Sequence, residues 1–185
     1  NSRGYLHQDD GLTCEDIQWA IENKAKEENI LTALSERVGG SWHDSKAPWH
    51  EKMDIALPCA TQNELDESAA KLLLKNGCIA VSEGANMPTT LEGVKAFHDA
   101  KIMYGPGKAA NAGGVAVSGL EMSQNSERVS WNHERLGEEL AELMDGIHDK
   151  CVEFGEADGY VDYVRGANIA GFKKVADAML AFGVV

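Results

Sequence analysis

Three polar side chains in small-residue surroundings have the chemistry to bind a small ligand. Asn86 follows an apolar run, while Asn111 and Ser118 lie seven residues apart in a glycine-rich segment. A side-chain amide offers both donors and an acceptor, which suits a carboxamide or a ribose hydroxyl. Ser118 lies about two helical turns beyond Asn111, with Val115 between them on the same face. This pattern favours a hydroxyl beside an apolar wall, at one end of a small polar substrate.

Simpler roles exist for two of these residues. Asn111 can cap the helix that follows it, and this role is compatible with ligand binding. Ser118 can donate a hydrogen bond to its own helix backbone, as serines inside helices often do. The residues alone leave these alternatives open.

The segment Tyr104–Gln124 is the most informative part of the chain. It contains Gly105–Ala110, which matches the loose dinucleotide-loop pattern G-x-G-x-x-A. However, this motif follows the third predicted strand rather than the first, and the next acidic residue, Glu121, lies inside the following helix. We therefore interpret the segment as a wall of a binding crevice, with glycines that permit close packing, rather than as a pyrophosphate loop.

The thiol and imidazole groups show no pattern typical of catalysis or metal binding. The four cysteines lack a CxxC spacing, and Cys59, in a loop, has no evident base partner. The six histidines show no metal-ligand spacing. We therefore predict reduced thiols, a cytoplasmic location, no metal site and no catalytic residue among these groups.

Short apolar runs alternate with amphipathic helices in the middle of the chain. The predicted strands are Met53–Leu57, whose apolar run is typical of a buried strand, Cys78–Val81 and Ile102–Tyr104. The helices between them are Glu64–Lys75, preceded by Asn63, and a helix to Ala100 with Thr89 and Glu92 as its capping box. This order predicts an α/β fold in which parallel strands are joined by right-handed crossovers.

Each predicted strand ends in small or polar residues. These loops are Pro58–Gln62, Glu83–Asn86 and Gly105–Lys108. Because the carboxyl ends of parallel strands meet at one sheet edge, the loops should line one shared crevice. Further on, helices are expected over Asn111–Arg128, Asn132–Phe154 and Tyr163–Ala181.

The first fifty residues are less regular. A polar opening over Gly4–Gly11 carries no strand or helix signal, Thr13 and Asp16 mark a helix start, and Gly39–His50 is predicted to be a loop. The first residue is Asn1 rather than methionine, so we expect a piece of a longer protein. The net charge of −13 over 185 residues argues against nucleic acid and anionic membranes as partners.

Four segments of the chain closely resemble the hexameric NAD(P)-dependent glutamate dehydrogenases. They are Asp54–Glu67, Glu83–Thr90, Pro106–Asn125 and Tyr163–Ala178. The resemblance implies a partial Rossmann-like coenzyme domain over residues 1–108, and C-terminal helices over residues 109–185 that pack on it and line the active-site cleft. It also implies that the first strands, the phosphate loop, the catalytic lysine and the catalytic aspartate lie upstream.

The resemblance implies roles for individual residues. The coenzyme-facing positions are Ala60, Thr61, Gln62, Asn86 and Asn111. The substrate-facing positions are Asn111, Val115 and Ser118, with Ser118 bonding the γ-carboxylate of glutamate. Leucine- and phenylalanine-type relatives have an apolar residue at the position of Ser118, so the hydroxyl favours glutamate.

The implied reaction is the reversible oxidative deamination of L-glutamate to 2-oxoglutarate and ammonia. We expect NADP as the coenzyme, with NAD as the alternative, and a homohexamer in the full-length protein. The chain alone is expected to be inactive. The competing hypothesis is a non-enzymatic nucleotide-binding or assembly module built on half a Rossmann sheet.

Overall fold

The computed structural model describes residues 3–183, and the chain divides into two compact units, Asn1–His50 and Glu51–Val185. The predicted domains, residues 1–108 and 109–185, also include Asn1, Ser2, Val184 and Val185. These four residues lie outside the described residues. The division predicted after Lys108, between a coenzyme domain and C-terminal helices, is based on the expected roles of the two parts and not on compactness. It stays a prediction.

The first unit contains more regular structure than the sequence predicted. Strands β1 (Gly4–His7) and β2 (Ser41–Asp44) pair antiparallel, with helices α1 (Cys14–Asn23) and α2 (Ile30–Val38) between them in sequence. The expectations of an irregular opening and of a loop after Gly39 were therefore wrong, and α2 was missed. Both strands have only four residues, too few for a clear alternation, and each depends on a partner that is distant in sequence.

The helix start predicted at Thr13 is confirmed. Thr13 caps α1, and its side chain accepts a hydrogen bond from the backbone N–H of Asp16 at 3.2 Å. The Asp16 carboxylate accepts from the Thr13 N–H at 3.1 Å, which completes a capping box. The Thr13 hydroxyl also donates to this carboxylate at 2.6 Å, and this bond, then the Thr13 N–H bond and the nearby Arg37, hold the pKa of Asp16 below its usual range.

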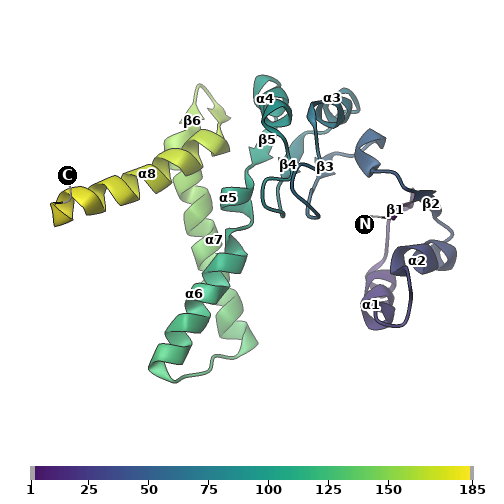
Figure 1. Ribbon diagram of the computed structural model, residues 1–185, viewed down its shortest axis with the longest axis horizontal. Helices are drawn as coiled ribbons and strands as arrows, with labels where there is room; N and C mark the ends of the chain where they lie inside the picture. The colour runs from purple at the N-terminus through teal and green to yellow at the C-terminus, as the bar shows by residue number, and fades with distance from the viewer. Residues whose placement is uncertain (1–2, 184–185) are drawn as a thin grey trace. The chain divides into compact units, whose positions relative to one another are not determined.

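The second unit is built on the predicted parallel sheet. Strands β3 (Ile55–Ala56), β4 (Ala80–Ser82) and β5 (Met103–Gly105) are parallel in the order β3-β4-β5. Helices α3 (Glu67–Lys75) and α4 (Leu91–Asp99) are the crossovers and lie next to each other beside the sheet (Figure 1). The predicted α/β class is confirmed.

The core of this unit lies between the sheet and its two crossover helices. Leu73 of α3 and Phe97 of α4 are fully buried, and the Phe97 ring stacks on Tyr104 of β5 at 5.6 Å between centroids. Val81, in the central strand, is also buried. Burial of these side chains holds the three strand ends in fixed positions.

The first predicted strand differs from its expected burial. Only Ala56 of β3 is buried, whereas Ile55 is 58 % exposed and Leu57 is 61 % exposed. Successive side chains of a strand point to opposite faces, so Ile55 and Leu57 lie on the sheet face that α3 and α4 do not cover. The apolar run was predicted correctly as a strand but wrongly as buried throughout.

Both crossover helices begin later than expected. Asp66, not Asn63, caps α3 through a bond from the Ala69 N–H at 2.9 Å, and Thr90, not Thr89, caps α4 through a bond from the Gly93 N–H at 3.3 Å. The residues just before α3 are held in loop contacts: the Leu65 N–H donates to the Pro88 carbonyl at 2.9 Å. These contacts between distant segments move both helix starts.

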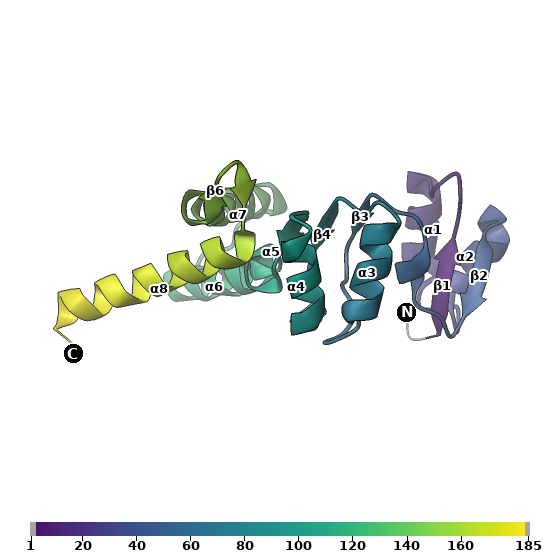
Figure 2. The ribbon, with the colours of Figure 1, turned by 90° about the horizontal axis from the view of Figure 1, so that it is seen from above.

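The C-terminal part is helical, as predicted, apart from one short hairpin, but its first helix begins at Gly107 rather than at Asn111, and Asn111 separates it from the next. It contains α5 (Gly107–Ala110), α6 (Ala112–Glu127), α7 (His133–Gly155), the strands β6 (Glu156–Ala157) and β7 (Tyr160–Val161), and α8 (Tyr163–Phe182). The second half of α8 extends beyond α7 in both views (Figures 1 and 2). Among residues 3–183, no helix is both long and apolar enough to cross a membrane.

Helices α7 and α8 meet at a very close backbone contact. A Cβ atom on Gly166 of α8 would lie 2.0 Å from the carbonyl oxygen of Cys151 of α7. One on Gly155 would lie 2.4 Å from the carbonyl oxygen of Asp162. Only glycine fits at either position, so these residues set the separation of the two helices.

Candidate functional site

The segments that follow the three strands lie close together, although the third, Gly105–Lys108, is the end of β5 and the start of α5 rather than a loop, and the shared crevice stays a prediction. The N–H groups of Gly84 and Ala85, after β4, donate to the Pro58 carbonyl, after β3, at 3.0 and 3.2 Å. A Cβ on Gly84 would lie 2.4 Å from Sγ of Cys59, so glycine is required there. The first two loops therefore form one continuous edge.

The coenzyme-facing positions proposed after β3 are accessible. Ala60, Thr61 and Gln62 are all exposed. The Glu64 carboxylate accepts hydrogen bonds from the Ala60 N–H at 2.8 Å and the Thr61 N–H at 3.4 Å. Glu64 thus holds the backbone of this loop, while the side chains of Ala60, Thr61 and Gln62 remain available to a ligand.

The structure brings Asn86 and Asn111 together. Nδ2 of Asn111 donates to the Ala85 carbonyl at 3.0 Å and to Oδ1 of Asn86 at 2.9 Å. Asn111 lies between α5 and α6, and its side chain makes no capping bond to α6. The Asn111 side chain therefore does not cap α6 and instead binds Ala85 and Asn86.

These two hydrogen bonds fix the orientation of both amides. A carbonyl oxygen can only accept, so the Asn111 atom that faces Ala85 is the amide nitrogen. Both of its protons are then in use, and they leave Oδ1 of Asn111 and Nδ2 of Asn86 without a partner among the described residues. The pair therefore presents one acceptor and one donor, the complement of a carboxamide.

A buried carboxylate lies beneath this pair. Glu83, the residue after β4, is 4 % exposed. Its Oε1 accepts from the Tyr104 hydroxyl at 2.5 Å and its Oε2 accepts from the Gly107 N–H at 2.7 Å. Burial, and then the hydrogen bond to Glu83, raise the pKa of the Tyr104 phenol well above its usual range.

The Gly107 bond also bears on the G-x-G-x-x-A motif. A pyrophosphate loop works by pointing free backbone N–H groups at an anion. Here the Gly107 N–H is already bound to a carboxylate, whose buried negative charge would repel a phosphate. The contact agrees with the interpretation of the motif as a product of close packing.

The substrate-facing positions of α6 are open. Val115 is 78 % exposed, and Ser118 is exposed one turn further along the helix. The Ser118 hydroxyl donates to the Gly114 carbonyl at 3.2 Å, which is the backbone role anticipated as the simpler one. To donate to a substrate carboxylate, the hydroxyl must rotate away from that bond.

Three residues of the site were not singled out by the sequence. Glu83 and Tyr104 form the buried network, and Glu64 supports the first loop. One signal for Glu83 was present, because a glutamate directly after a buried strand and before a glycine needs buried donors nearby. Two of those donors, Tyr104 and Gly107, lie more than 20 positions later in the sequence, which no local pattern reveals.

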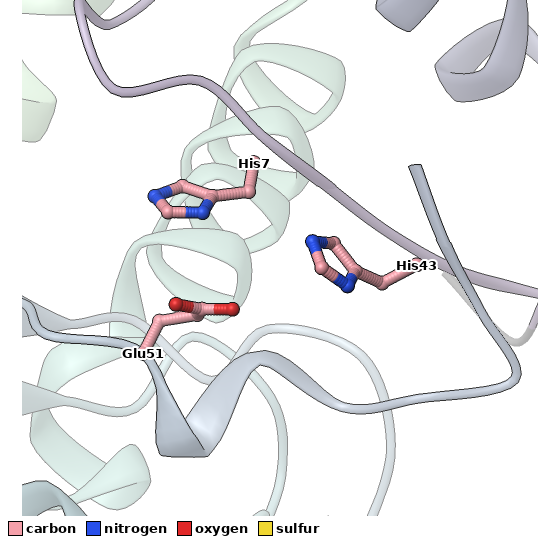
Figure 3. A group of neighbouring side chains, drawn as sticks. All are labelled: His7, His43 and Glu51. Carbon is pink, nitrogen blue, oxygen red and sulfur yellow. The ribbon is translucent and has the colours of Figure 1, made fainter. Parts of the chain in front are cut away.

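The cysteines lie in separate elements, whereas three histidines of the first unit, His7, His43 and His50, lie around the Tyr5 ring or next to one another. Cys59 is exposed at the sheet edge, and burial raises the pKa of the thiols of Cys78 and Cys151. In the first unit, the rings of His7 and His43 lie 6.4 Å apart at 40° (Figure 3). Glu51, drawn with them, belongs to the second unit, and no site is assigned to these three side chains.

Comparison with known proteins gives consistent results. The family described as Glutamate/Leucine/Phenylalanine/Valine dehydrogenase matches residues 1–183. A glutamate dehydrogenase of Bacteroides thetaiotaomicron is 54 % identical over all of this chain, which covers 42 % of that protein. An NADP-specific glutamate dehydrogenase of Salmonella typhimurium is 49 % identical over all of this chain and 41 % of that protein.

A solved structure shows the same arrangement. The crystal structure of Plasmodium falciparum glutamate dehydrogenase matches all of this chain with a TM-score of 0.92 and 41 % identity, over 40 % of that protein. The chain thus spans about two fifths of the length of the relatives that it matches.

Proposed function

Because the chain belongs to the Glutamate/Leucine/Phenylalanine/Valine dehydrogenase family, we propose that it forms the coenzyme and substrate side of the active site of a glutamate dehydrogenase. The proposed reaction is the reversible oxidative deamination of L-glutamate to 2-oxoglutarate and ammonia. The observation that carries the proposal is the Asn86–Asn111 pair at the carboxyl edge of the parallel sheet. Ligands of open α/β sheets bind outside this edge.

The residues at this edge fit a nicotinamide coenzyme. Oδ1 of Asn111 can accept from the amide NH₂ of a carboxamide, and Nδ2 of Asn86 can donate to its carbonyl or to a ribose hydroxyl. Such a coenzyme, when bound, supplies hydride transfer. The exposed loop of Ala60, Thr61 and Gln62 lines the same edge and completes the proposed coenzyme surface. We propose NADP, with NAD as the alternative.

Ser118 and Val115 are the proposed substrate contacts. A hydroxyl that donates to the γ-carboxylate makes a charge-assisted hydrogen bond, whereas an aliphatic substrate would leave it unpaired. Val115 supplies an exposed apolar surface one helical turn away. Together these side chains favour glutamate over leucine or phenylalanine.

The remaining parts of the proposal follow from the family. A homohexamer and a cytoplasmic location are expected of the full-length protein. No acid or base of the reaction is assigned to the described residues. Residues 1–185 assayed by themselves are therefore expected to show no turnover, and glutamate-dependent NADPH production by this isolated chain would contradict that expectation.

The test uses the full-length protein with a matched pair of variants. Ser118→Ala should raise the KM for glutamate by about 10- to 100-fold, because it removes a hydrogen bond to a charged group. Ser123→Ala is the control, since Ser123 makes the same bond to its own helix, to the Gly119 carbonyl at 3.1 Å. The absence of glutamate-dependent reduction of either coenzyme by the wild-type protein would reject the proposal.

A further inference from the structure

Glu83 is a buried carboxylate that is held by uncharged groups. It accepts from the Tyr104 hydroxyl, the Gly107 N–H and, at 3.3 Å, the Thr89 N–H. Among residues 3–183, no lysine, arginine or histidine forms an ion pair with it. Burying a charge without a counter-ion costs free energy unless hydrogen bonds compensate it. The hydrogen bonds to Glu83 therefore constrain the backbone segments that donate them.

The carboxylate joins the two segments that carry the asparagine pair. Glu83 lies three residues before Asn86, and its N–H donates to the Gly105 carbonyl of β5 at 3.0 Å. Its Oε2 holds the N–H of Gly107, the first residue of α5. The Gly107 carbonyl in turn accepts from the Asn111 N–H at 3.0 Å. Hydrogen bonds through Gly107 therefore connect Glu83 to the backbone of Asn111, while Asn86 lies three residues after Glu83 in the same loop.

The packing around Gly107 is tight enough to transmit a displacement. A Cβ on Gly107 would lie 2.8 Å from the Ala85 carbonyl oxygen, 3.2 Å from Oε2 of Glu83 and 3.3 Å from Nδ2 of Asn111. The Ala85 carbonyl is also the group that Asn111 binds. A small shift of α5 away from Glu83 would thus move Asn111 relative to its two acceptors.

We propose that Glu83 is a positioning residue for coenzyme binding, which holds Asn111 against Asn86 by fixing the start of α5. This inference rests on the proposed function, because it assigns the pair to the coenzyme. Glu83 does not touch the ligand; it acts through Gly107 and the Asn111 backbone.

The network requires a carboxylate rather than an amide. A glutamine at position 83 has one acceptor oxygen and one NH₂ group. If the NH₂ group takes the place of Oε2, it faces the Gly107 N–H, which is also a donor. If it takes the place of Oε1, it faces the Thr89 N–H, again a donor. Either orientation leaves one buried backbone donor unpaired. Glu83→Gln, nearly identical in shape, therefore disturbs the hydrogen bonds with little change in packing.

The experiment measures the dissociation constants of NADPH and NADH by calorimetry on the full-length protein. At a temperature where every variant is folded, Glu83→Gln should weaken binding of the preferred coenzyme at least about fivefold. Hydrogen exchange in the peptide that covers residues 105–111 should become faster in the same variant. Gly107→Ala, whose added methyl group would press against the Ala85 carbonyl and Oε2 of Glu83, should weaken binding similarly and serves if Glu83→Gln does not fold.

Two controls separate positioning from stability. Leu73→Ala, in the core of α3, should lower the unfolding midpoint and leave the coenzyme dissociation constant unchanged. Glu92→Gln, on the exposed face of α4, should change neither. If Glu83→Gln lowers the midpoint but binds coenzyme like the wild type, or if Gly107→Ala does so, the inference is overturned. If the wild-type protein binds neither coenzyme, the proposed function itself fails.

Discussion

The side-chain amide of Asn111 donates to Oδ1 of Asn86 at 2.9 Å, across 25 residues of sequence. This bond joins the loop after β4 to the junction between α5 and α6, and it orients both amides. One acceptor, on Asn111, and one donor, on Asn86, are left for a ligand. A pair of this polarity, at the carboxyl edge of a parallel sheet, is the central feature of the proposed site.

Replacing the amide of Asn111 by a carboxylate tests this pair directly. Asn111→Asp turns the two donor contacts into contacts between oxygen atoms, so both hydrogen bonds are lost. We expect the coenzyme dissociation constant to rise by at least about tenfold, as measured by calorimetry. Asn125→Asp, an exposed change near the end of α6, the helix that follows Asn111, is the matched control and should leave binding unchanged. Equal affinity for the two variants would rule out a binding role for the pair.

Two helical glycines should respond oppositely to the same substitution. Gly166→Ala places a methyl group against the Cys151 carbonyl and should lower the free energy of unfolding by about 1–3 kcal/mol or more. Gly137→Ala meets no atom within 4 Å and should raise it by about 0.5–1 kcal/mol. Denaturant titration of both variants provides the measurement. An unaffected Gly166→Ala would contradict the close contact between α7 and α8, and a destabilised Gly137→Ala would contradict the open space around position 137.

The buried phenol of Tyr104 predicts a loss of stability at high pH. Burial and the Glu83 bond raise its pKa, so the folded state keeps a proton that the unfolded state loses above pH 10.0. The unfolded state then binds fewer protons, and the free energy of unfolding falls as pH rises, by up to about 1.4 kcal/mol per pH unit for this group. Tyr104→Phe lacks this contribution.

Comparison of the wild type with Tyr104→Phe isolates the effect from other titrating groups. The difference between their free energies of unfolding should be constant from pH 8 to about pH 10. Above about pH 10, the free energy of unfolding of the wild type should fall relative to that of Tyr104→Phe. Denaturant titrations across this range provide the data. Parallel profiles throughout would mean that Tyr104 ionises normally in the folded protein.

The four thiols should fall into two reactivity classes. Cys78 and Cys151 are buried and their pKa values are raised, whereas Cys14 and Cys59 are exposed. With iodoacetamide at pH 8, mass spectrometry should therefore show fast labelling of Cys14 and Cys59 and slow labelling of the buried pair. In denaturant all four should react alike.

Coenzyme should slow one of these reactions selectively. Cys59 lies beside Gly84 at the sheet edge, so a ligand bound there should protect it, whereas Cys14, in the first unit, should be labelled as before. Unchanged labelling of Cys59 at saturating coenzyme would place the ligand elsewhere.

Much of the fold followed from local patterns. The helices predicted from Asn132 and from Tyr163 begin at His133 and Tyr163, because their apolar spacing is a signal that lies within a few turns of chain. The starts of α3 and α4 were misplaced because the Leu65 and Thr90 N–H groups bond to distant carbonyls. The antiparallel pair of β1 and β2 was missed because each strand is short and its partner lies far along the chain.

The sequence by itself determined the alternation of strands and helices, the edge where the loops meet, and the candidates Asn86, Asn111 and Ser118. These depend on residue type and spacing, which a linear chain displays directly. Only the tertiary structure decided that Asn111 binds Asn86 rather than capping α6, and that Glu83 holds the Gly107 N–H. Hydrogen bonds between segments more than 20 residues apart depend on how the sheet brings its strand ends together, and no local pattern contains that geometry.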